Sequence, residues 1–340
     1  MKNGNVTIKD VSQIAGVSKT TVSRYLNQKY EHMSEKTKEK IKKTIEELDF
    51  RPNLTARTLK SQKTNLIGVI VPDISNPVTV LLIKGVIDEC AKAGYQVITA
   101  CSDENTAKEE KYAKAMIDRQ VEGLIVNIVD YNEFDLLKNL SDKGTKIVLA
   151  DRTINRPVLD MVTTNNYEMT KELIRALYGM GFEQVAFFSS DLLKSNVRYN
   201  RYSAFLKQSK EYVGDPDALA YLFNGNGEEK YKKALSEFVA KNPGKRIAAF
   251  ASTPMALLNL LAAVHELGLN TPGDIGVCGY DNLPWTKLIN GGITVVEQPY
   301  YDVGAQSAKL LIRRIEGKEV SCPWYVELKS KIIFRNSTKI

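Results

Sequence analysis

Residues 7–27 read TIKDVSQIAGVSKTTVSRYLN, and this stretch decides the fold of the N-terminal part of the chain. Thr7 and Asp10 stand in the capping-box arrangement, which favours the start of a helix. Apolar residues then recur at helical spacing up to Gly16, and Ser18 is suited to cap a second short helix. Two short helices joined by a tight glycine turn predict a helix-turn-helix.

A third helix and a change of composition complete this region. Ser34 is suited to cap a helix whose apolar residues share one face, and Arg51-Pro52 ends the block. Residues 53–60 predict a helix that is too short to be stable alone in water, and a polar linker follows it. We therefore expect three parts: a helix-turn-helix head at 1–50, a hinge helix and linker at 51–64, and a core at 65–340.

From Leu66 onward, short apolar runs alternate with amphipathic segments. This alternation predicts parallel sheets that are covered on both faces by helices. Two such series favour an α/β core of two doubly wound subdomains, with a hinged cleft between the carboxyl ends of their strands. We expect strands at 66–71, 95–100, 123–128, 146–150, 184–188, 219–223, 247–250 and 275–279, helices at 78–93, 106–119, 132–141, 167–179, 198–209, 227–240 and 254–267, and a strand-like region at 324–334.

Positive charge is concentrated in the first part of the chain. The whole chain has a formal net charge of +7, with 47 Lys and Arg against 40 Asp and Glu. Residues 1–60 contain 13 Lys and Arg against 7 Asp and Glu, so the remaining residues are nearly neutral. This asymmetry predicts a polyanionic partner for the head, although a solvated basic surface would give the same count.

Several classes of protein are disfavoured by what the sequence contains. No apolar run reaches the ~20 residues that span a bilayer, and the start lacks the apolar stretch of a secretory signal, so we expect a cytoplasmic protein. His32 and His265 lie far apart in the sequence, so we expect neither a metal site nor a cofactor. We expect reduced, buried, inert thiols at the four scattered cysteines, Cys90, Cys101, Cys278 and Cys322.

Taken together, these motifs resemble the LacI/GalR family of bacterial repressors. The resemblance covers essentially the whole chain, and its head signature is the most specific part. In the head it rests on Thr7–Val11, Ala15–Ser18, Thr21–Arg24 and Leu26-Asn27, and in the hinge on Arg51–Asn53, Ala56-Arg57 and Leu59. In the core it rests on Ile67–Pro77, Val277–Asn282, Gln298-Pro299, Gly304, Ala308 and Leu310-Leu311.

The resemblance implies a DNA-binding head. A recognition helix presents its first residues to base edges in the major groove, and Lys19, Thr20 and Arg24 occupy such positions. In the family, a leucine at the position of Leu59 wedges into the minor groove, and here packing within the core or between two hinge helices is the alternative. The expected DNA-binding residues are Thr7, Ser18, Lys19, Thr20, Thr21, Ser23, Arg24, Asn27, Asn53, Ala56, Arg57 and Leu59.

The carboxyl ends of the predicted strands supply candidate ligands for a small effector: Asp73, Asn76, Asp151, Arg152, Arg198, Arg201 and Asp281. The resemblance implies that Arg201 and Asp281 grip the ligand. Alternatives stay open for the others. Asp73 and Asn76 suit turn chemistry, Asp151 and Arg152 suit a structural ion pair, and Arg198 suits a solvated surface.

Departures from the family pattern bear on the kind of effector. Val78-Thr79 stand where aromatic residues are frequent, and Thr253-Pro254 replace a more usual Asn or Ser followed by Asp. Asn165 stands where an acid is frequent and Phe182 where a histidine is frequent. A pocket with fewer acids, less aromatic wall and several arginines favours a sugar acid or keto-sugar acid, of the 2-keto-3-deoxygluconate kind, over a neutral hexose.

The sequence thus predicts a homodimeric repressor of carbohydrate or sugar-acid catabolism that binds palindromic operator DNA and responds to an effector in the cleft. A neutral sugar, a purine corepressor and a non-regulatory sugar-binding protein are the alternatives. An enzyme is not expected. The first strand-to-helix turn has no G-x-G-x-x-G, and the chain contains no P-loop and no G-x-S-x-G elbow.

Overall fold

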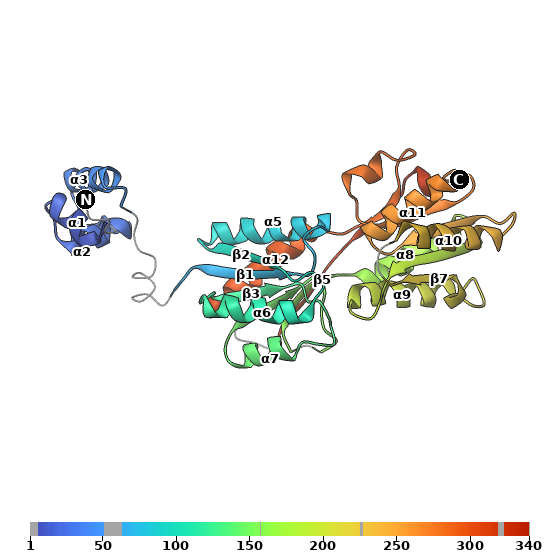
Figure 1. The fold of residues 1–340 in the computed structure, drawn as a ribbon, viewed down its shortest axis with the longest axis horizontal. Coiled ribbons are helices and arrows are strands. Elements are labelled where there is room, and N and C mark those ends of the chain that lie inside the picture. The colour runs from blue at the N-terminus through green and yellow to red at the C-terminus, as the bar shows by residue number, and fades with distance from the viewer. Residues whose placement is uncertain (1–5, 51–62, 157, 225–226, 319–322, 340) are drawn as a thin grey trace. The chain divides into compact units, whose positions relative to one another are not determined.

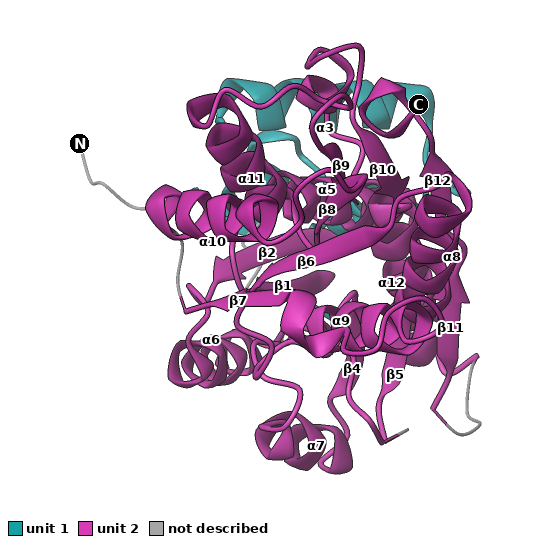
Figure 2. Ribbon diagram, turned by 90° about the vertical axis from the view of Figure 1, so that its right-hand side faces the viewer, with its two compact units in different colours: residues 1–64 teal, residues 65–340 magenta. Residues whose placement is uncertain are grey.

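The computed structural model describes residues 6–50, 63–156, 158–224, 227–318 and 323–339. The chain divides into two compact units, residues 1–64 and 65–340, which Figure 2 colours separately. The hinge candidates Asn53, Ala56, Arg57 and Leu59 lie outside the described residues.

The first unit is the predicted helical head. It contains α1 (Ile8–Ile14), α2 (Lys19–Leu26) and α3 (Glu35–Glu47), and its core is built from Val11, Ala15, Val22, Ile41 and Phe50. The turn between α1 and α2 requires a glycine, because Gly16 has φ +59°, where L side chains are strained. The helix-turn-helix prediction is therefore confirmed.

The second unit consists of two lobes, each built on a six-stranded sheet (Figure 1). In lobe 1 the strand order is β11-β5-β4-β3-β1-β2, and every pairing is parallel. Its strands are β1 (Leu66–Val71), β2 (Gln96–Cys101), β3 (Gly123–Val126), β4 (Lys146–Ala150), β5 (Asp160–Thr164) and β11 (Tyr325–Leu328), and its helices are α5 (Pro77–Lys92), α6 (Thr106–Asp118), α7 (Asp135–Asp142) and α12 (Tyr300–Ile315).

Lobe 2 has the strand order β12-β10-β9-β8-β6-β7, and only the β10–β12 pair is antiparallel. Its strands are β6 (Gln184–Ser190), β7 (Ala220–Phe223), β8 (Ile247–Ala251), β9 (Gly276–Tyr280), β10 (Thr294–Glu297) and β12 (Lys331–Ile333). Its α-helices are α8 (Asn166–Gly179), α9 (Asn196–Ser209), α10 (Glu228–Ala240) and α11 (Pro254–Glu266), with short 3-10 helices at Asp217–Leu219, Pro284–Lys287 and Asn336–Thr338. The predicted class, an α/β core of two wound sheets, is confirmed.

The C-terminal segment returns to lobe 1, which the sequence pattern did not predict. Helix α12 packs along α5 and against β3, β4 and β5. The two helices cross at glycines, because a Cβ on Gly85 would lie 2.0 Å from the Tyr301 carbonyl oxygen and a Cβ on Gly304 would lie 2.0 Å from that of Leu82. Each lobe is therefore assembled from separate parts of the chain.

Most expected elements lie within a few residues of the observed ones. Helix α7 begins at Asp135 rather than near residue 132, because the Asp130 carboxylate accepts hydrogen bonds from the backbone and side-chain nitrogens of Asn132 and holds a turn there. Strands β5 and β10 and helix α12 were not among the expected elements. Cys90 and Cys278 are buried free thiols and Cys101 is half-buried, whereas Cys322 lies outside the described residues.

Candidate functional site

The head presents one face of α2 to solvent. Ser18 caps this helix by accepting a hydrogen bond from the Thr21 nitrogen at 3.1 Å. Lys19, Thr20 and Arg24 are exposed on it, so their side chains are available for contact. Around them, Ser18 and Asn27 are exposed and Thr21 and Ser23 are half-buried.

Thr7 opens α1 through the predicted capping box. Its backbone nitrogen and its hydroxyl both donate to an Asp10 carboxylate oxygen, at 2.8 and 2.6 Å. These hydrogen bonds lower the pKa of Asp10 below its usual value. Thr7 therefore fixes where α1 begins.

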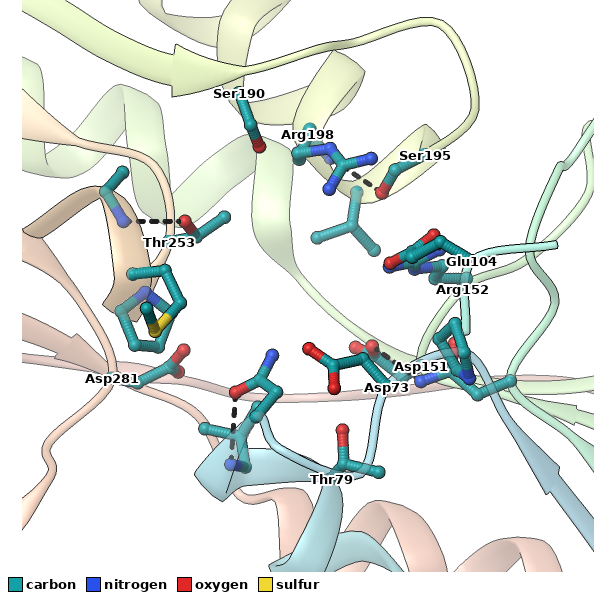
Figure 3. Close-up of a pocket in the computed structure, with 18 of the residues that line it drawn as sticks. Asp73, Thr79, Glu104, Asp151, Arg152, Ser190, Ser195, Arg198, Thr253 and Asp281 are labelled. Carbon is teal, nitrogen blue, oxygen red and sulfur yellow. Dashed lines mark hydrogen bonds and ion pairs between the residues drawn. The ribbon is translucent and has the colours of Figure 1, made fainter. Parts of the chain in front are cut away.

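A cavity of about 420 Å³ lies between the two lobes and contains all seven effector candidates from the sequence (Figure 3). Lobe 1 contributes the carboxyl ends of β1, β3 and β4, and lobe 2 those of β6 and β9. The first turns of α5, α9 and α11 also open on it. Its volume is within the range of small-molecule sites, roughly 300–1,000 Å³.

Arg201 is buried and makes three side-chain hydrogen bonds. It is 2% exposed, its Nε and Nη2 donate to Asn166 Oδ1 at 2.9 and 2.7 Å, and its Nη1 donates to the Ser252 carbonyl oxygen at 2.5 Å. Its guanidinium also stacks on the Tyr280 ring, 3.5 Å from the centroid. This arginine is held rigidly at one wall of the cavity.

Gln298 joins the lobes at the point where the chain crosses between them. Its Nε2 donates to Asp281 Oδ1 and to the Tyr300 hydroxyl, both at 2.8 Å, while its Oε1 accepts from the Thr164 hydroxyl at 2.7 Å. We call Thr164, Asn166, Arg201, Ser252, Asp281, Gln298 and Tyr300 the hinge network. Its polar groups position Asp281 in the cavity.

The cavity carboxylates Asp151 and Asp281 have unsatisfied oxygens. Asp151 Oδ1 and Asp281 Oδ2 are buried without a hydrogen-bond partner among the described residues, as is Asn127 Oδ1 nearby. Burial raises the pKa of Asp281 to about 6 and also raises the pKa of Asp151. Three buried acceptors without donors suit a ligand rich in hydroxyl groups.

Both acids also have backbone conformations that are uncommon for their residue type. Asp151 has φ +69° and Asp281 has φ +76°, in the left-handed region. Such strain at the ends of β4 and β9 directs both side chains into the cavity, as Figure 3 shows, and strained residues of this kind cluster at binding sites.

Arg152 forms an ion pair, but its partner is Glu104 rather than Asp151. Its Nη1 and Nη2 contact the two Glu104 carboxylate oxygens at 2.9 and 2.5 Å, and Nη1 also donates to the carbonyl oxygens of Ile128 and Val129. The alternative of an ion pair between Asp151 and Arg152 is therefore wrong, because Arg152 pairs with Glu104 instead. Asp151 instead accepts from Asn127 Nδ2 at 3.3 Å.

Arg198 is half-buried rather than fully solvated. It lines the cavity, and its Nε is buried without a hydrogen-bond partner among the described residues. Burial, together with the positive charge of Arg152, lowers the pKa of Arg198 to about 10. Its backbone nitrogen donates to Ser195 Oγ, which caps α9 (Figure 3).

Asp73 and Asn76 combine turn chemistry with a place in the cavity lining. Asp73 Oδ1 accepts from the nitrogen and hydroxyl of Ser75 at 2.8 and 2.6 Å, and Asn76 Oδ1 accepts from the Val78 nitrogen at 3.3 Å, capping α5. Turn formation and ligand contact are therefore compatible at these positions.

Sequence reasoning missed several residues of the site. Glu104 and Asn127 follow β2 and β3, so the strand-end rule that found Asp151 also applies to them. Asn166 gave no local signal, and Gln298 was noted only as part of the Gln298-Pro299 motif of the resemblance; both support the cavity without lining it. The further polar lining residues are Thr79, Ser190, Asp191, Lys194, Ser195, Thr253 and Tyr300, and the departures Asn165 and Phe182 lie outside the lining.

The two lobes also contact each other directly, through what we call the interlobe clasp. Asn196 at the start of α9 accepts from the Thr153 nitrogen at 3.1 Å and donates to the Thr153 hydroxyl at 2.7 Å. The Tyr131 nitrogen donates to the Lys194 carbonyl oxygen at 3.4 Å, and Asn132 Nδ2 to that of Leu193 at 3.4 Å. The segment 193–198 thus carries both clasp contacts and cavity residues.

Two negative findings apply to the described part of the chain. None of its helices is long and apolar enough to cross a membrane. Within the same residues, no group of three or more His, Cys, Asp or Glu side chains is arranged to hold a metal ion.

Comparison with known proteins gives matches over both units. A family model described as "Bacterial regulatory proteins, lacI family" matches residues 7–53, and one described as "Periplasmic binding protein domain" matches residues 67–319. The HTH-type transcriptional regulator KdgR of Bacillus subtilis (strain 168) is 36% identical over 336 residues and is matched over 98% of each chain. The ribose operon repressor of Halalkalibacterium halodurans is 30% identical, over 98% of this chain and 97% of that one.

A solved structure has the same fold throughout. It is the crystal structure of the Lac repressor dimer bound to operator and the anti-inducer ONPF, with a TM-score of 0.85 and 21% identity. The match covers 99% of this chain and 100% of that chain.

Proposed function

This chain belongs to the lacI family of bacterial regulatory proteins, and on that premise we propose that it is a transcriptional repressor of carbohydrate or sugar-acid catabolism. A sugar acid in the interlobe cavity would control its affinity for operator DNA. The names of relatives, among them a ribose operon repressor, support a carbohydrate-related role.

The observation that carries the proposal is the set of unsatisfied polar groups in the cavity. The buried oxygens of Asp151 and Asp281 need donors, and the buried Nε of Arg198 needs an acceptor. A polyhydroxylated acid supplies both, because its hydroxyls donate and its carboxylate accepts. Leaving such groups unpaired costs about 1–3 kcal/mol each, so a ligand that pairs them gains affinity.

The expectation that the pocket contains few acidic residues is wrong. The cavity lining includes four basic residues, Arg152, Lys194, Arg198 and Arg201, but also five acidic ones, Asp73, Glu104, Asp151, Asp191 and Asp281. An acidic effector is favoured instead by the difference in how the cavity arginines are paired. Glu104 pairs with Arg152, and the hinge network uses three of the five N–H groups of Arg201, so Arg201 would contact the ligand only with the other two. The Arg198 guanidinium is the group that we assign to the carboxylate of the ligand.

In this proposal the head reads DNA through the exposed face of α2. Lys19, Thr20 and Arg24 would contact base edges, and the small polar residues around them would contact phosphates or cap helices. Asn53, Ala56, Arg57 and Leu59 would contact the minor groove or the backbone. One head covers a half-site, so a two-fold pair of chains would read a palindrome.

Exposed apolar side chains support a homodimer. Ile74 precedes α5, and Val80, Leu81 and Ile87 lie on it, all exposed in the single chain. Tyr301 on the adjoining α12 is also exposed. Exposed apolar side chains gathered on one helix and its neighbour favour an interaction surface, and a two-fold pairing would cover them on both chains.

A neutral sugar or a purine corepressor is the alternative effector, and a non-regulatory sugar-binding protein the alternative class. The head disfavours the latter. For the direction of regulation, we propose that the effector is an inducer, whose binding releases the operator.

The test combines two measurements on the full chain. Titration calorimetry across neutral sugars, sugar acids, sugar phosphates and purines identifies the effector class, and a gel shift on palindromic duplexes identifies operator binding. We expect a sugar acid to bind most tightly and to weaken the shifted band. Tighter binding of a neutral sugar would contradict the acid preference, and a folded protein that binds no duplex at low salt would contradict the regulatory role.

A further inference from the structure

Three arginines line the cavity, and they differ in whether their guanidinium groups are engaged. Arg201 donates three hydrogen bonds to Asn166 and Ser252, and Arg152 forms a two-point pair with Glu104. The Nε of Arg198 is buried without a hydrogen-bond partner among the described residues. Arg198 is half-buried, and an Nε that is shielded from water without a partner lowers stability, so this side chain suits ligand binding better than a structural role.

The acids near Arg198 do not occupy it. Asp191 uses Oδ1 to accept a hydrogen bond from the Leu193 nitrogen at 2.9 Å, and both Glu104 oxygens contact Arg152. Their charges act on Arg198 only at a distance. One monovalent anion in the cavity is therefore the complement that this guanidinium lacks.

The surroundings of Arg198 favour an anion. It stands in the first turn of α9, where the helix dipole is positive, and Lys194 lines the cavity just before it. Ser190 and Ser195 lie on either side of Arg198 in Figure 3, and Ser190 is a cavity-lining hydroxyl. Backbone dipoles, hydroxyls and a planar guanidinium together suit a carboxylate.

The cavity is polarised along its length. Figure 3 shows Arg198 and Ser190 across the opening from Asp281, Asp73 and Asp151. Hydroxyl acceptors thus lie on one side and the unpaired cation on the other. A chain of carbons that carries hydroxyls and ends in one carboxylate would span the two.

We propose that Arg198, assisted by Lys194, forms a carboxylate subsite on lobe 2 that selects sugar acids over neutral sugars of the same carbon skeleton. This inference rests on the proposed function and names the residue that decides the effector class. A single carboxylate fits better than a phosphate, because the second negative charge of a phosphate would face Asp191 and Glu104 without a partner.

The test uses matched ligand pairs on the full chain. Calorimetry compares gluconate with sorbitol and galacturonate with galactose, and gluconate 6-phosphate tests the second charge. We expect the wild-type chain to bind the better acid at least about tenfold tighter than its neutral partner. Arg198→Met should abolish that ratio, Arg198→Lys should retain part of it, and Lys194→Met should reduce it less than Arg198→Met does.

Controls separate a lost subsite from a damaged protein. Lys207→Met removes an exposed charge from the same helix and should leave the ratio unchanged. Thermal unfolding of Arg198→Met should occur close to the wild-type temperature, because the half-buried charge that is removed has no hydrogen-bond partner for its Nε. Affinity for the neutral partner reports whether the rest of the cavity is intact.

Two results would overturn the subsite. One is a wild-type chain that binds the neutral or phosphorylated ligand more tightly than the acid. The other is an Arg198→Met chain that keeps the acid preference. If either occurs while some ligand still changes operator affinity, the subsite fails and the proposed regulation stands. If no ligand in the panel binds and operator affinity never responds, the proposed regulation fails as well.

Discussion

The two sides of the cavity differ in how far their polar groups are satisfied. On the hinge side, Arg201, Gln298 and Thr164 bond to groups far away in the sequence. Within the hinge network only Asp281 Oδ2 is buried without a hydrogen-bond partner among the described residues, whereas Arg198, three residues from Arg201 on the same helix, lacks a partner for its Nε. Satisfied networks specify one geometry, whereas unsatisfied groups cost stability and suit binding. Two neighbouring arginines in one cavity therefore have different roles, Arg201 in holding the geometry and Arg198 in binding.

The largest expected effect comes from breaking the satisfied side. Arg201→Met leaves Asn166 Oδ1 without its donor and removes the cation near the buried Asp281 and Asp151 carboxylates. We expect the free energy of unfolding of the core to fall by about 3 to 5 kcal/mol. Urea unfolding followed by tryptophan fluorescence measures this, because both tryptophans lie in the core unit.

Arg198→Met is the matched control, with the same chemical change three residues earlier. We expect it to cost no more than about 0.5 kcal/mol. Equal losses of stability in the two variants would remove the distinction between the two sides of the cavity.

The next effect concerns the pH dependence of stability. Burial raises the pKa of Asp281 from 3.8 to about 6, so the folded state binds this proton more tightly than the unfolded state does. The stabilisation that results is complete below pH ~4 and is lost as pH rises through about 6. It amounts to up to about 3 kcal/mol.

Asp281→Asn keeps an acceptor for Gln298 but no longer titrates. We expect a smaller loss of unfolding free energy between pH 5 and pH 7 in this variant than in the wild type, by denaturant titration at each pH. Burial raises the pKa of Asp151 and raises that of Glu109 to about 7, so part of the dependence should remain. An unchanged dependence in the variant would show that Asp281 titrates as it does in the unfolded chain.

The smallest effect concerns the interlobe clasp. Asn196→Ala removes both hydrogen bonds to Thr153, which should shift the lobes toward separation by about 1 kcal/mol. Effector affinity should then fall about fivefold and the radius of gyration of the effector-free core should rise, measured by calorimetry and small-angle scattering.

Thr153→Val and the double variant complete a mutant cycle. If the clasp acts as a pair, the two single effects should not add. Strict additivity, with each variant affecting stability but not effector affinity, would mean that these residues serve only their own lobes.

The parts of the molecule that sequence predicts well are those with short-range causes. The head depends on caps that reach three residues, from Ser18 to Thr21 and from Thr7 to Asp10, so the sequence indicates it directly. The strand-end rule likewise places Asp73, Asp151 and Asp281 at the cavity, because the carboxyl ends of parallel strands meet at one edge.

The rest depends on contacts across long stretches of chain. Arg152 meets Glu104 over 48 residues and Thr164 meets Gln298 over 134, and neither pairing leaves a periodic signal. The same limit applies to α12, which was not among the expected elements and which packs on lobe 1 through contacts with α5 and with β3, β4 and β5. Arg198 shows the limit for a single side chain, since position in a helix cannot tell a surface residue from a cavity residue.

The most direct test measures whether effector binding in the core changes the affinity of the head for operator DNA. An operator is first selected from a randomised palindromic library, and its affinity for the full chain is then titrated by fluorescence anisotropy at fixed salt, with and without the best sugar acid. We predict that the acid weakens operator binding by about 5- to 150-fold, and that operator weakens acid binding by the same factor. An operator affinity that is the same without the acid and at saturating acid would contradict the proposed regulation.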